Sequence, residues 1–192
     1  MNARRTPLRP RLRHRSFARE LVSTVLFLVA MYTLMEMTLP RSIVQSISME
    51  PNLIADQRLI ISRINYLLGQ PQRGDIVVFN ATDTRPGEPP LIKRLIGLPG
   101  ETLEIRDGAV YINGVELDEP YLNEPCSLSR CKDRVWVLAS DEYFFMGDNR
   151  NHSHDSRAFG PIHRNQIIGR AIVRYWPPGV WGILSYTYGD SP

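Results

Sequence analysis

A long apolar segment near the start of the chain, LVSTVLFLVAMYTLMEMTL, constrains the fold more than any other feature. It runs from Leu21 to Leu39 and is followed by Pro40. As a helix with a rise of about 1.5 Å per residue it would extend roughly 28 Å, close to the ~30 Å hydrocarbon core of a bilayer. The segment predicts a transmembrane anchor over residues 20–40.

A second role for the same segment stays open. Its strictly apolar part, Leu21 to Met35, is short enough to be the apolar region of a cleavable signal peptide. The sequence Ser46-Ile47-Ser48 also resembles a small-residue cleavage pattern. We favour an uncleaved anchor, because the segment continues to Pro40 without small residues at its end.

The tail that precedes the anchor, residues 1–19, is rich in arginine and contains no acidic residue. A basic arm can bind nucleic acid, but arginines directly before a membrane span are typical of a cytoplasmic flank. We therefore predict contact with a lipid bilayer and no nucleic-acid partner. The N-terminus should be cytoplasmic, and the chain after Pro40 should be extracytoplasmic, on the periplasmic or lumenal side.

The rest of the chain has the pattern of one β-rich domain over residues 41–192, a length that suits a single core. Asp107-Gly108 and Asn113-Gly114 supply the positive φ angles of tight hairpin turns, so a three-stranded meander is expected over 102–117. A helical turn is expected near residues 65–69. The prediction is a mainly β fold: a compact antiparallel β-sheet domain behind a single N-terminal transmembrane helix. Residues 102–140 should form a small hairpin-rich insert, and the other strand-like runs are 74–79, 135–140, 142–148 and 167–176.

The two cysteines, Cys126 and Cys131, lie close together in the sequence. Two thiols without clustered histidines make a weak zinc site. On the far side of a membrane a local disulfide is one interpretation, and two free buried thiols are the other.

Three polar clusters could carry chemistry: QSISMEPNL at 45–53, the strand around Lys93, and GDNRNHSHDSR at 147–157. His152 and His154 with Asp148 or Asp155 could ligate an ion, but alternating spacing on a loop is a weak signal. A Ser-His-Asp hydrolase is also conceivable, yet the chain has no G-x-S-x-G nucleophile elbow. We expect no metal and no cofactor.

The run LIKRLIG places Lys93 on the same face of a strand as Leu91 and Leu95, while Arg94 faces the other side and can extend to water. A neutral lysine amine can serve as the base for a serine nucleophile. Burial lowers the pKa of an amine and so raises its neutral fraction. Taken alone, the strand favours an ordinary lysine that extends to water, and only the other clusters change that interpretation.

Five sequence boxes in order resemble those of the type I signal peptidases (leader peptidases), a family of membrane-anchored Ser/Lys proteases. SISMEPNL resembles the family's Ser-x-Ser-Met-x-Pro-Thr-Leu, and DQRLIISR and GDIVVF resemble the next two boxes. IKRLIGLPGE is similar to the lysine box, and GDNRNHSHDSR is similar to Gly-Asp-Asn-x-x-x-Ser-x-Asp-Ser-Arg. The resemblance extends from the anchor to about Trp176.

The resemblance implies a serine endopeptidase that removes N-terminal signal peptides from exported preproteins at the membrane surface. Ser48 would be the nucleophile and Lys93 the general base. The Ser46 hydroxyl and the Ser48 backbone N–H would form the oxyanion hole, and Ser153 would orient the lysine. The remaining implied roles are a substrate-pocket residue, Met49, and a structural charge cluster, Asp148, Asp155 and Arg157.

The sequence departs from the family pattern at several positions. Gln45 and Ile47 stand where the family often has Pro and Gly, and Asn52 stands where Thr is common. Ile47 is β-branched and restricts the backbone that must aim both serines. His152, His154 and His163 fall on variable positions and are expected at the surface. Two other functions stay open: a non-catalytic membrane-anchored β module that binds exported chains, and a Ser-His hydrolase that uses His152 or His154.

Overall fold

The computed structural model describes residues 17–83, 85 and 87–184. The predicted basic tail therefore lies outside the described residues, except for its last three. The chain divides into two units, Met1–Met37 and Thr38–Pro192. The first contains helix α1 (Phe17–Thr38), which with 22 residues is long enough, and on average apolar enough, to cross a membrane. This helix covers most of the predicted anchor.

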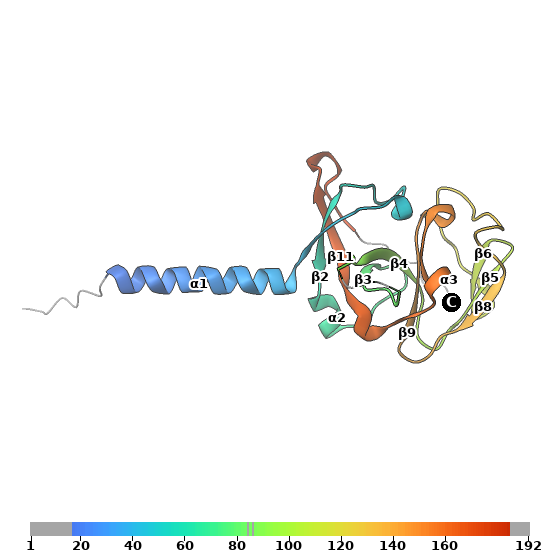
Figure 1. Cartoon of the computed structure of the whole chain (residues 1–192), viewed down its shortest axis with the longest axis horizontal. Coiled ribbons are helices and arrows are strands. Elements are labelled where there is room, and N and C mark those ends of the chain that lie inside the picture. Colours follow the sequence, from blue (N-terminus) through green and yellow to red (C-terminus); the bar gives the residue numbers. More distant parts are fainter. Residues whose placement is uncertain (1–16, 84, 86, 185–192) are drawn as a thin grey trace, which may run out of the picture. The chain divides into compact units, whose positions relative to one another are not determined.

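The second unit is built on an antiparallel eight-stranded sheet (Figure 1). Its order is β1-β2-β11-β3-β4-β9-β10, and β12 pairs with β11. The register of the long strand β11 against β2 shifts twice, as expected where a sheet bends strongly. The strands are β1 (Arg41–Ile43), β2 (Arg58–Ser62), β3 (Ile76–Phe79), β4 (Leu91–Gly97), β9 (Glu142–Met146), β10 (Ile162–His163), β11 (Ile167–Trp176) and β12 (Gly182–Ile183).

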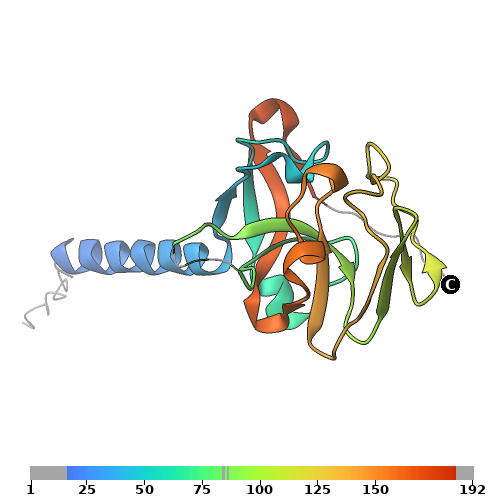
Figure 2. The same ribbon diagram turned by 45° about the vertical axis from the view of Figure 1, so that its right-hand side comes forward.

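A separate four-stranded sheet, in the order β7-β6-β5-β8, forms the insert (Figure 2). Its strands are β5 (Thr102–Arg106), β6 (Ala109–Ile112), β7 (Val115–Glu116) and β8 (Arg134–Val137). The two turns between β5, β6 and β7 have positive φ at both central residues: 52° and 82° at Asp107-Gly108, and 50° and 85° at Asn113-Gly114. The predicted meander is confirmed, since these are the angles that Asp-Gly and Asn-Gly favour.

Short helical turns connect the strands. Helix α2 (Ile64–Leu68) forms where a helical turn is predicted. Helix α3 (Ser156–Phe159) has Asp155 as its N-cap residue, and the Asp155 side chain accepts from the Arg157 N–H. The single-turn 3₁₀ helices are η1 (Ile47–Met49), η2 (Arg150–His152), η3 (Arg164–Gln166) and η4 (Pro178–Val180). Two of these turns, η1 and η2, carry the residues of the candidate site.

Strand β4 lies in the interior of the main sheet, paired with β3 on one side and β9 on the other. Leu95 belongs to one buried apolar cluster, with Phe79 and Phe145, and Ile92 belongs to another, with Val78. Both faces of the strand are therefore covered, and a polar side chain on either face is enclosed by protein.

The loop of the insert between β7 and β8 carries the two cysteines, which form a disulfide. The sequence left open either a disulfide or two free buried thiols, and the structure contains the disulfide. Both cysteines are buried against the core of the insert with Trp136 and Leu138.

Candidate active site

The 3₁₀ turn η1 brings Ser48 to the side chain of Lys93 on β4. The Lys93 amine, Nζ, lies 2.6 Å from Ser48 Oγ and also donates to the backbone oxygen of Ile92 at 3.2 Å. Ser48 is 5% exposed and Lys93 is 3% exposed. A hydroxyl and an amine that are 45 residues apart in sequence are thus held in direct contact and away from bulk water.

Burial lowers the pKa of Lys93 from 10.5 to about 8. The carboxylates of Asp155 and Asp148 act in the opposite direction and raise it, and the guanidinium of Arg157 lowers it further. The loss of hydration is the largest of these effects, because a buried ammonium ion cannot recover its interactions with water.

Ser46 lies beside the same pair, with its Oγ 3.0 Å from Ser48 Oγ. Ser48 is the second residue of η1, and the first N–H groups of a helical turn have no acceptor within that turn. The predicted oxyanion donors, the Ser46 hydroxyl and the Ser48 N–H, therefore belong to one turn. Ile47 does not hold the serines apart, since their hydroxyl oxygens are 3.0 Å from each other, and its own side chain is half exposed.

The loop that follows β9 supports this turn. The Asn149 N–H donates to the Ser48 carbonyl at 3.0 Å. The approach depends on Gly147, because a Cβ at that position would overlap the Ser153 hydroxyl and would lie 2.5 Å from the Ser48 carbonyl oxygen. Ser153 is thus close to the nucleophile's turn. Its Oγ is buried, and among the described residues no hydrogen bond joins it to Lys93, whose amine donates to Ser48 and Ile92.

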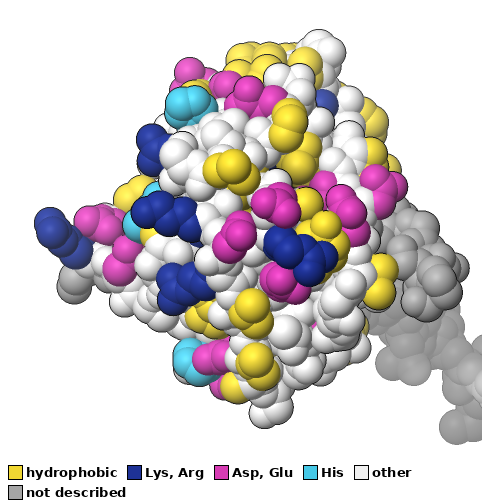
Figure 3. Space-filling model, turned by 90° about the vertical axis from the view of Figure 1, so that its right-hand side faces the viewer, with side chains coloured by type: hydrophobic (Ala, Val, Ile, Leu, Met, Phe, Trp, Pro, Cys, Tyr) yellow, Lys and Arg dark blue, Asp and Glu magenta, His cyan; other side chains and the backbone are white. Residues whose placement is uncertain are grey.

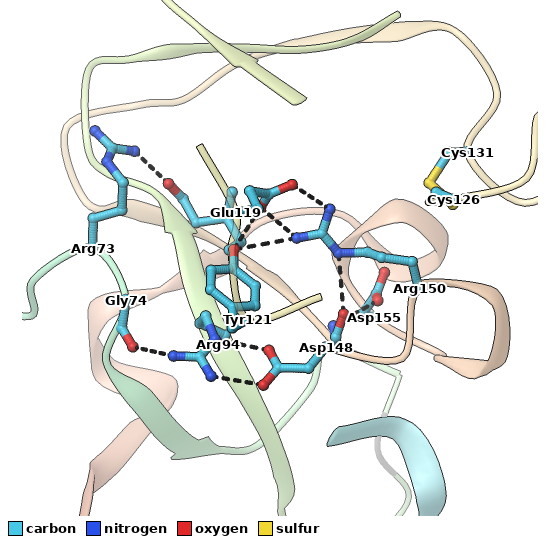
Figure 4. A network of polar contacts seen from close by, with 12 residues as sticks. Arg73, Gly74, Arg94, Glu119, Tyr121, Cys126, Cys131, Asp148, Arg150 and Asp155 are labelled. Carbon is cyan, nitrogen blue, oxygen red and sulfur yellow. Dashed lines mark hydrogen bonds and ion pairs between the residues drawn. A yellow bond between two sulfur atoms is a disulfide. The ribbon is translucent and has the colours of Figure 1, made fainter. Parts of the chain in front are cut away.

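The predicted charge cluster is present as two buried ion pairs. Asp148 receives two hydrogen bonds from Arg94, at 2.8 and 2.7 Å (Figure 4). Asp155 receives two from the Arg157 side chain, both at 2.8 Å. Asp155 also accepts from the Gly147 N–H at 3.0 Å. Although burial raises the pKa of Asp155, its hydrogen bonds to Arg157 and Gly147 hold that pKa below the ordinary value.

The prediction that Arg94 extends to water is wrong. Arg94 is 2% exposed, and besides Asp148 it donates to the Gly74 carbonyl at 2.9 Å. Its guanidinium also lies over the Tyr121 ring, 4.1 Å from the centroid. Because β4 is covered on both faces, its side chains have no route to solvent on either side, and a buried carboxylate compensates the charge instead.

A second buried arginine, Arg150, was not predicted. It is 1% exposed, pairs with Glu119 of the insert, and donates from Nε to the Gly147 carbonyl at 3.1 Å (Figure 4). Asn52, which departs from the family pattern, donates to Asp148 at 2.8 Å and to the Tyr121 carbonyl at 2.9 Å. No local sequence signal identifies the contacts of Arg150 with Glu119 or of Asn52 with Asp148 and Tyr121, because these partners come from distant segments.

Met49 was predicted to line a substrate pocket, but it is 1% exposed and packs in the core with Val44 and Leu53. Met49 therefore packs η1 against the core. Its burial gives no evidence for a role in a substrate pocket. The turn directs Ser48 to Lys93 and places the next side chain in the core.

The three histidines are exposed, as predicted. His154 Nε2 lies 2.9 Å from Asp83 Oδ2, and His163 Nδ1 lies 3.0 Å from Asp141 Oδ2. Across the described residues, no group of three or more His, Cys, Asp or Glu side chains is placed to hold a metal ion. The histidine contacts in this part of the chain give the Ser-His alternative no geometric support.

In comparisons with known proteins, the family model and the relatives that match this chain are signal peptidases. A family model described as "Signal peptidase, peptidase S26" matches residues 18–176. A probable signal peptidase I-2 from Synechocystis sp. is 43% identical over 145 residues, which cover 74% of this chain and 65% of the relative. The chain thus spans slightly less than two thirds of that relative. A signal peptidase I from Leptolyngbya laminosa is 42% identical over 146 residues, covering 73% of this chain and 70% of the relative.

A crystal structure of a signal peptidase I from Enterococcus faecalis is also similar. It is 37% identical and covers 53% of this chain and 96% of that chain, with a TM-score of 0.46. The apolar helix α1 together with the signal peptidase relatives supports a membrane-anchored protein.

Proposed function

The chain belongs to the signal peptidase family, peptidase S26, whose members are serine peptidases, and on that premise we propose that it cleaves signal peptides from preproteins with Ser48 and Lys93. Ser48 is the nucleophile and Lys93 is the general base. The proposal has its main support in one observation, the 2.6 Å contact between a buried amine and the serine hydroxyl.

The lowered pKa of Lys93 makes this amine useful near neutral pH. With a pKa of about 8, roughly one amine in ten is neutral at pH 7, against about one in 3,000 for an amine with the ordinary value of 10.5. Burial thus increases the concentration of the reactive form by about 300-fold. A lysine extended to water would lack this advantage.

In the first half-reaction, Ser48 Oγ attacks the carbonyl carbon of the scissile peptide bond and transfers its proton to the neutral amine of Lys93. The negative charge that develops on the carbonyl oxygen is stabilised by the Ser48 N–H and the Ser46 hydroxyl. Such donors are commonly worth about 3 kcal/mol each, because they are oriented before the charge forms. Lys93 then donates the proton to the leaving amine, which becomes the N-terminus of the mature protein.

In the second half-reaction, the signal peptide is held as an ester on Ser48. The amine of Lys93, neutral again, takes a proton from a water molecule, whose oxygen attacks the ester carbonyl. The same donors stabilise the second tetrahedral intermediate. Its collapse returns the proton from Lys93 to Ser48 and releases the signal peptide as a carboxylic acid, which loses its proton to water. Asp148, Asp155 and Arg157 keep the residues in place and do not react.

The substrate and the location follow from the family and from helix α1. Preproteins with signal peptides are the substrates that the family implies. Small side chains just before the cut, and two residues earlier, would be required by shallow apolar pockets. Helix α1 would cross the bilayer with the basic tail in the cytoplasm, so the site would face the extracytoplasmic side. An anchored enzyme meets the cleavage junction at high effective concentration.

The test is the cleavage of a purified model preprotein in detergent by the wild-type enzyme, Ser48→Ala, Lys93→Ala and Lys93→Arg. Lys93→Arg retains a positive charge but cannot accept a proton, so all three variants should lose at least a thousandfold in kcat/KM. Cleavage by Ser48→Ala at more than a few per cent of the wild-type rate would contradict the proposal and favour a non-catalytic or differently catalysed function.

A further inference from the structure

A cavity of about 620 Å³ lies between the insert and the loop that follows β9. One wall is the end of the disulfide loop and the start of β8, residues 129–134, with Trp136 beside them. The other wall is residues 150–158, which include η2 and the start of α3. The proposed reaction uses no side chain of the first wall.

The cavity is strongly basic. Arg130, Lys132 and Arg134 are exposed on its rim, and none of them forms an ion pair within the described part of the chain. The acids that line the cavity are Asp133, whose Oδ1 accepts from the Asp107 N–H, and Asp155, which is bound by Arg157. Figure 3 shows several Lys and Arg side chains at the left of the face that carries the insert, with Asp and Glu side chains among them and a His side chain beside them.

Both walls of the cavity are held in place. The disulfide closes the loop from Cys126 to Cys131, and the Ser127 N–H donates to the Asn151 side chain at 2.9 Å. Arg157 Nη1 lies 3.0 Å from the Cys131 sulfur and so ties the second wall to the first. The rim cations therefore project from a fixed frame, which lowers the entropic cost of binding an anion.

The cavity also adjoins the reacting groups. Ser153 lines it, and the same residue lies against Gly147, which packs on the Ser48 carbonyl. The Ser153 hydroxyl is buried in this wall of the cavity, beside the Asp155 carboxylate. An extended chain advances about 3.3 Å per residue. Residues three to five positions after the cut would therefore lie about 10 to 16 Å from it in an extended substrate.

We propose that this cavity binds acidic side chains in the first few residues of the mature chain and so favours preproteins that carry Asp or Glu just after the cleavage site. This inference rests on the proposed function. The mature side is the better match in charge, because a signal peptide offers a basic segment followed by an apolar one and no anion. Carboxylates three to five residues after the cut would lie at the rim cations, and lysines there would be repelled.

The test uses three model preproteins that differ only at the third to fifth residues after the cut, which are all Glu, all Gln or all Lys. Kcat/KM is measured for wild type, for the cavity variant Arg130→Gln/Lys132→Gln, and for the control Arg85→Gln/Arg106→Gln. The control removes the same charge from exposed sites that do not line the cavity. We expect wild type and control to prefer Glu over Gln by about fivefold at low salt. The ratio of kcat/KM for the Glu preprotein to that for the Gln preprotein should approach one in the cavity variant. In wild type this ratio should fall when 0.5 M NaCl is added.

The other outcomes are distinguishable. If wild type cleaves all three preproteins equally well, the inference is overturned and the proposed function stands. If wild type cleaves none of them, both are overturned. Equal loss of the preference in cavity and control variants would assign it to net charge and overturn the cavity site. If the Glu preference is unchanged in the cavity variant, the rim cations do not bind the substrate and the inference is overturned.

Discussion

Replacing Lys93 by methionine should make the protein more stable while abolishing its activity. Methionine has nearly the same length and shape as lysine but carries no charge. In the native protein the ammonium form of Lys93 is penalised by burial, which lowers the pKa from 10.5 to about 8. In the unfolded chain the ammonium is hydrated and the penalty is absent. The substitution removes that penalty.

The size of the effect depends on pH in a defined way. Below about pH 8 both states are protonated and the full difference in pKa applies, which corresponds to about 3 kcal/mol of lost native stability. As the pH rises from about 8 to 10.5, the unfolded chain binds more protons than the native state, so the native state gains stability. At pH 9.5 the remaining penalty is about 1 kcal/mol. The stability advantage of Lys93→Met should therefore shrink by about 2 kcal/mol between pH 7 and pH 9.5.

The assay is urea unfolding of full-length wild type and Lys93→Met in detergent at the two pH values. The lost hydrogen bonds to Ser48 and Ile92 reduce the absolute gain by about 1 kcal/mol each. They do not depend on pH in the same way, so the change between pH 7 and pH 9.5 is the diagnostic quantity. A difference in stability between the two proteins that stays constant with pH would refute a native Lys93 pKa near 8.

Four further predictions concern activity. Kcat/KM should fall about tenfold per pH unit below pH 8, as Lys93 gains its proton; a flat profile between pH 5 and 9 would contradict a lysine base. Arg157→Gln should move this acidic limb to higher pH, because Arg157 lowers the pKa of Lys93; an unmoved limb in a folded variant would contradict that coupling. Gly147→Ala should reduce kcat at least 100-fold, since its Cβ would displace the Ser48 turn; activity near wild type would show that the loop can yield. His152→Gln/His154→Gln should cleave within about twofold of wild type, and a loss comparable to that of Lys93→Ala would support a Ser-His hydrolase.

The parts of the fold that were predictable from sequence depend on neighbouring residues. The insert's meander follows from Asp107-Gly108 and Asn113-Gly114, because the turn conformation is a local property of those dipeptides. Helix α1 follows from continuous apolarity. The proximity of Ser48 to Lys93 has no such local basis and was expected only because the sequence boxes resemble a known family.

The buried arginines show where local patterns fail. Alternation along β4 places Arg94 opposite Lys93, but it does not reveal that both faces of the strand are covered. Arg150 was likewise unremarkable in a polar loop, and its partner Glu119 lies 31 residues away. Burial of a charge depends on a compensating group elsewhere in the chain, and a single sequence does not pair such groups.

The two buried arginine pairs explain how a dry lysine can lie among carboxylates and remain a base. Asp148 and Asp155 both favour the charged form of Lys93, and without counter-ions they would raise its pKa toward the ordinary value. Each carboxylate instead has an arginine bound through two hydrogen bonds, so each pair is close to neutral. The pairs fix Gly147 and the loop beneath Ser48, and the rise in the pKa of Lys93 that the two carboxylates cause stays smaller than the fall that burial causes. An arginine suits this position better than a lysine, because its guanidinium stays charged when buried and its geometry matches a carboxylate. The same burial that costs stability at Lys93 is therefore tolerable at Arg94 and Arg157, where every charge is paired.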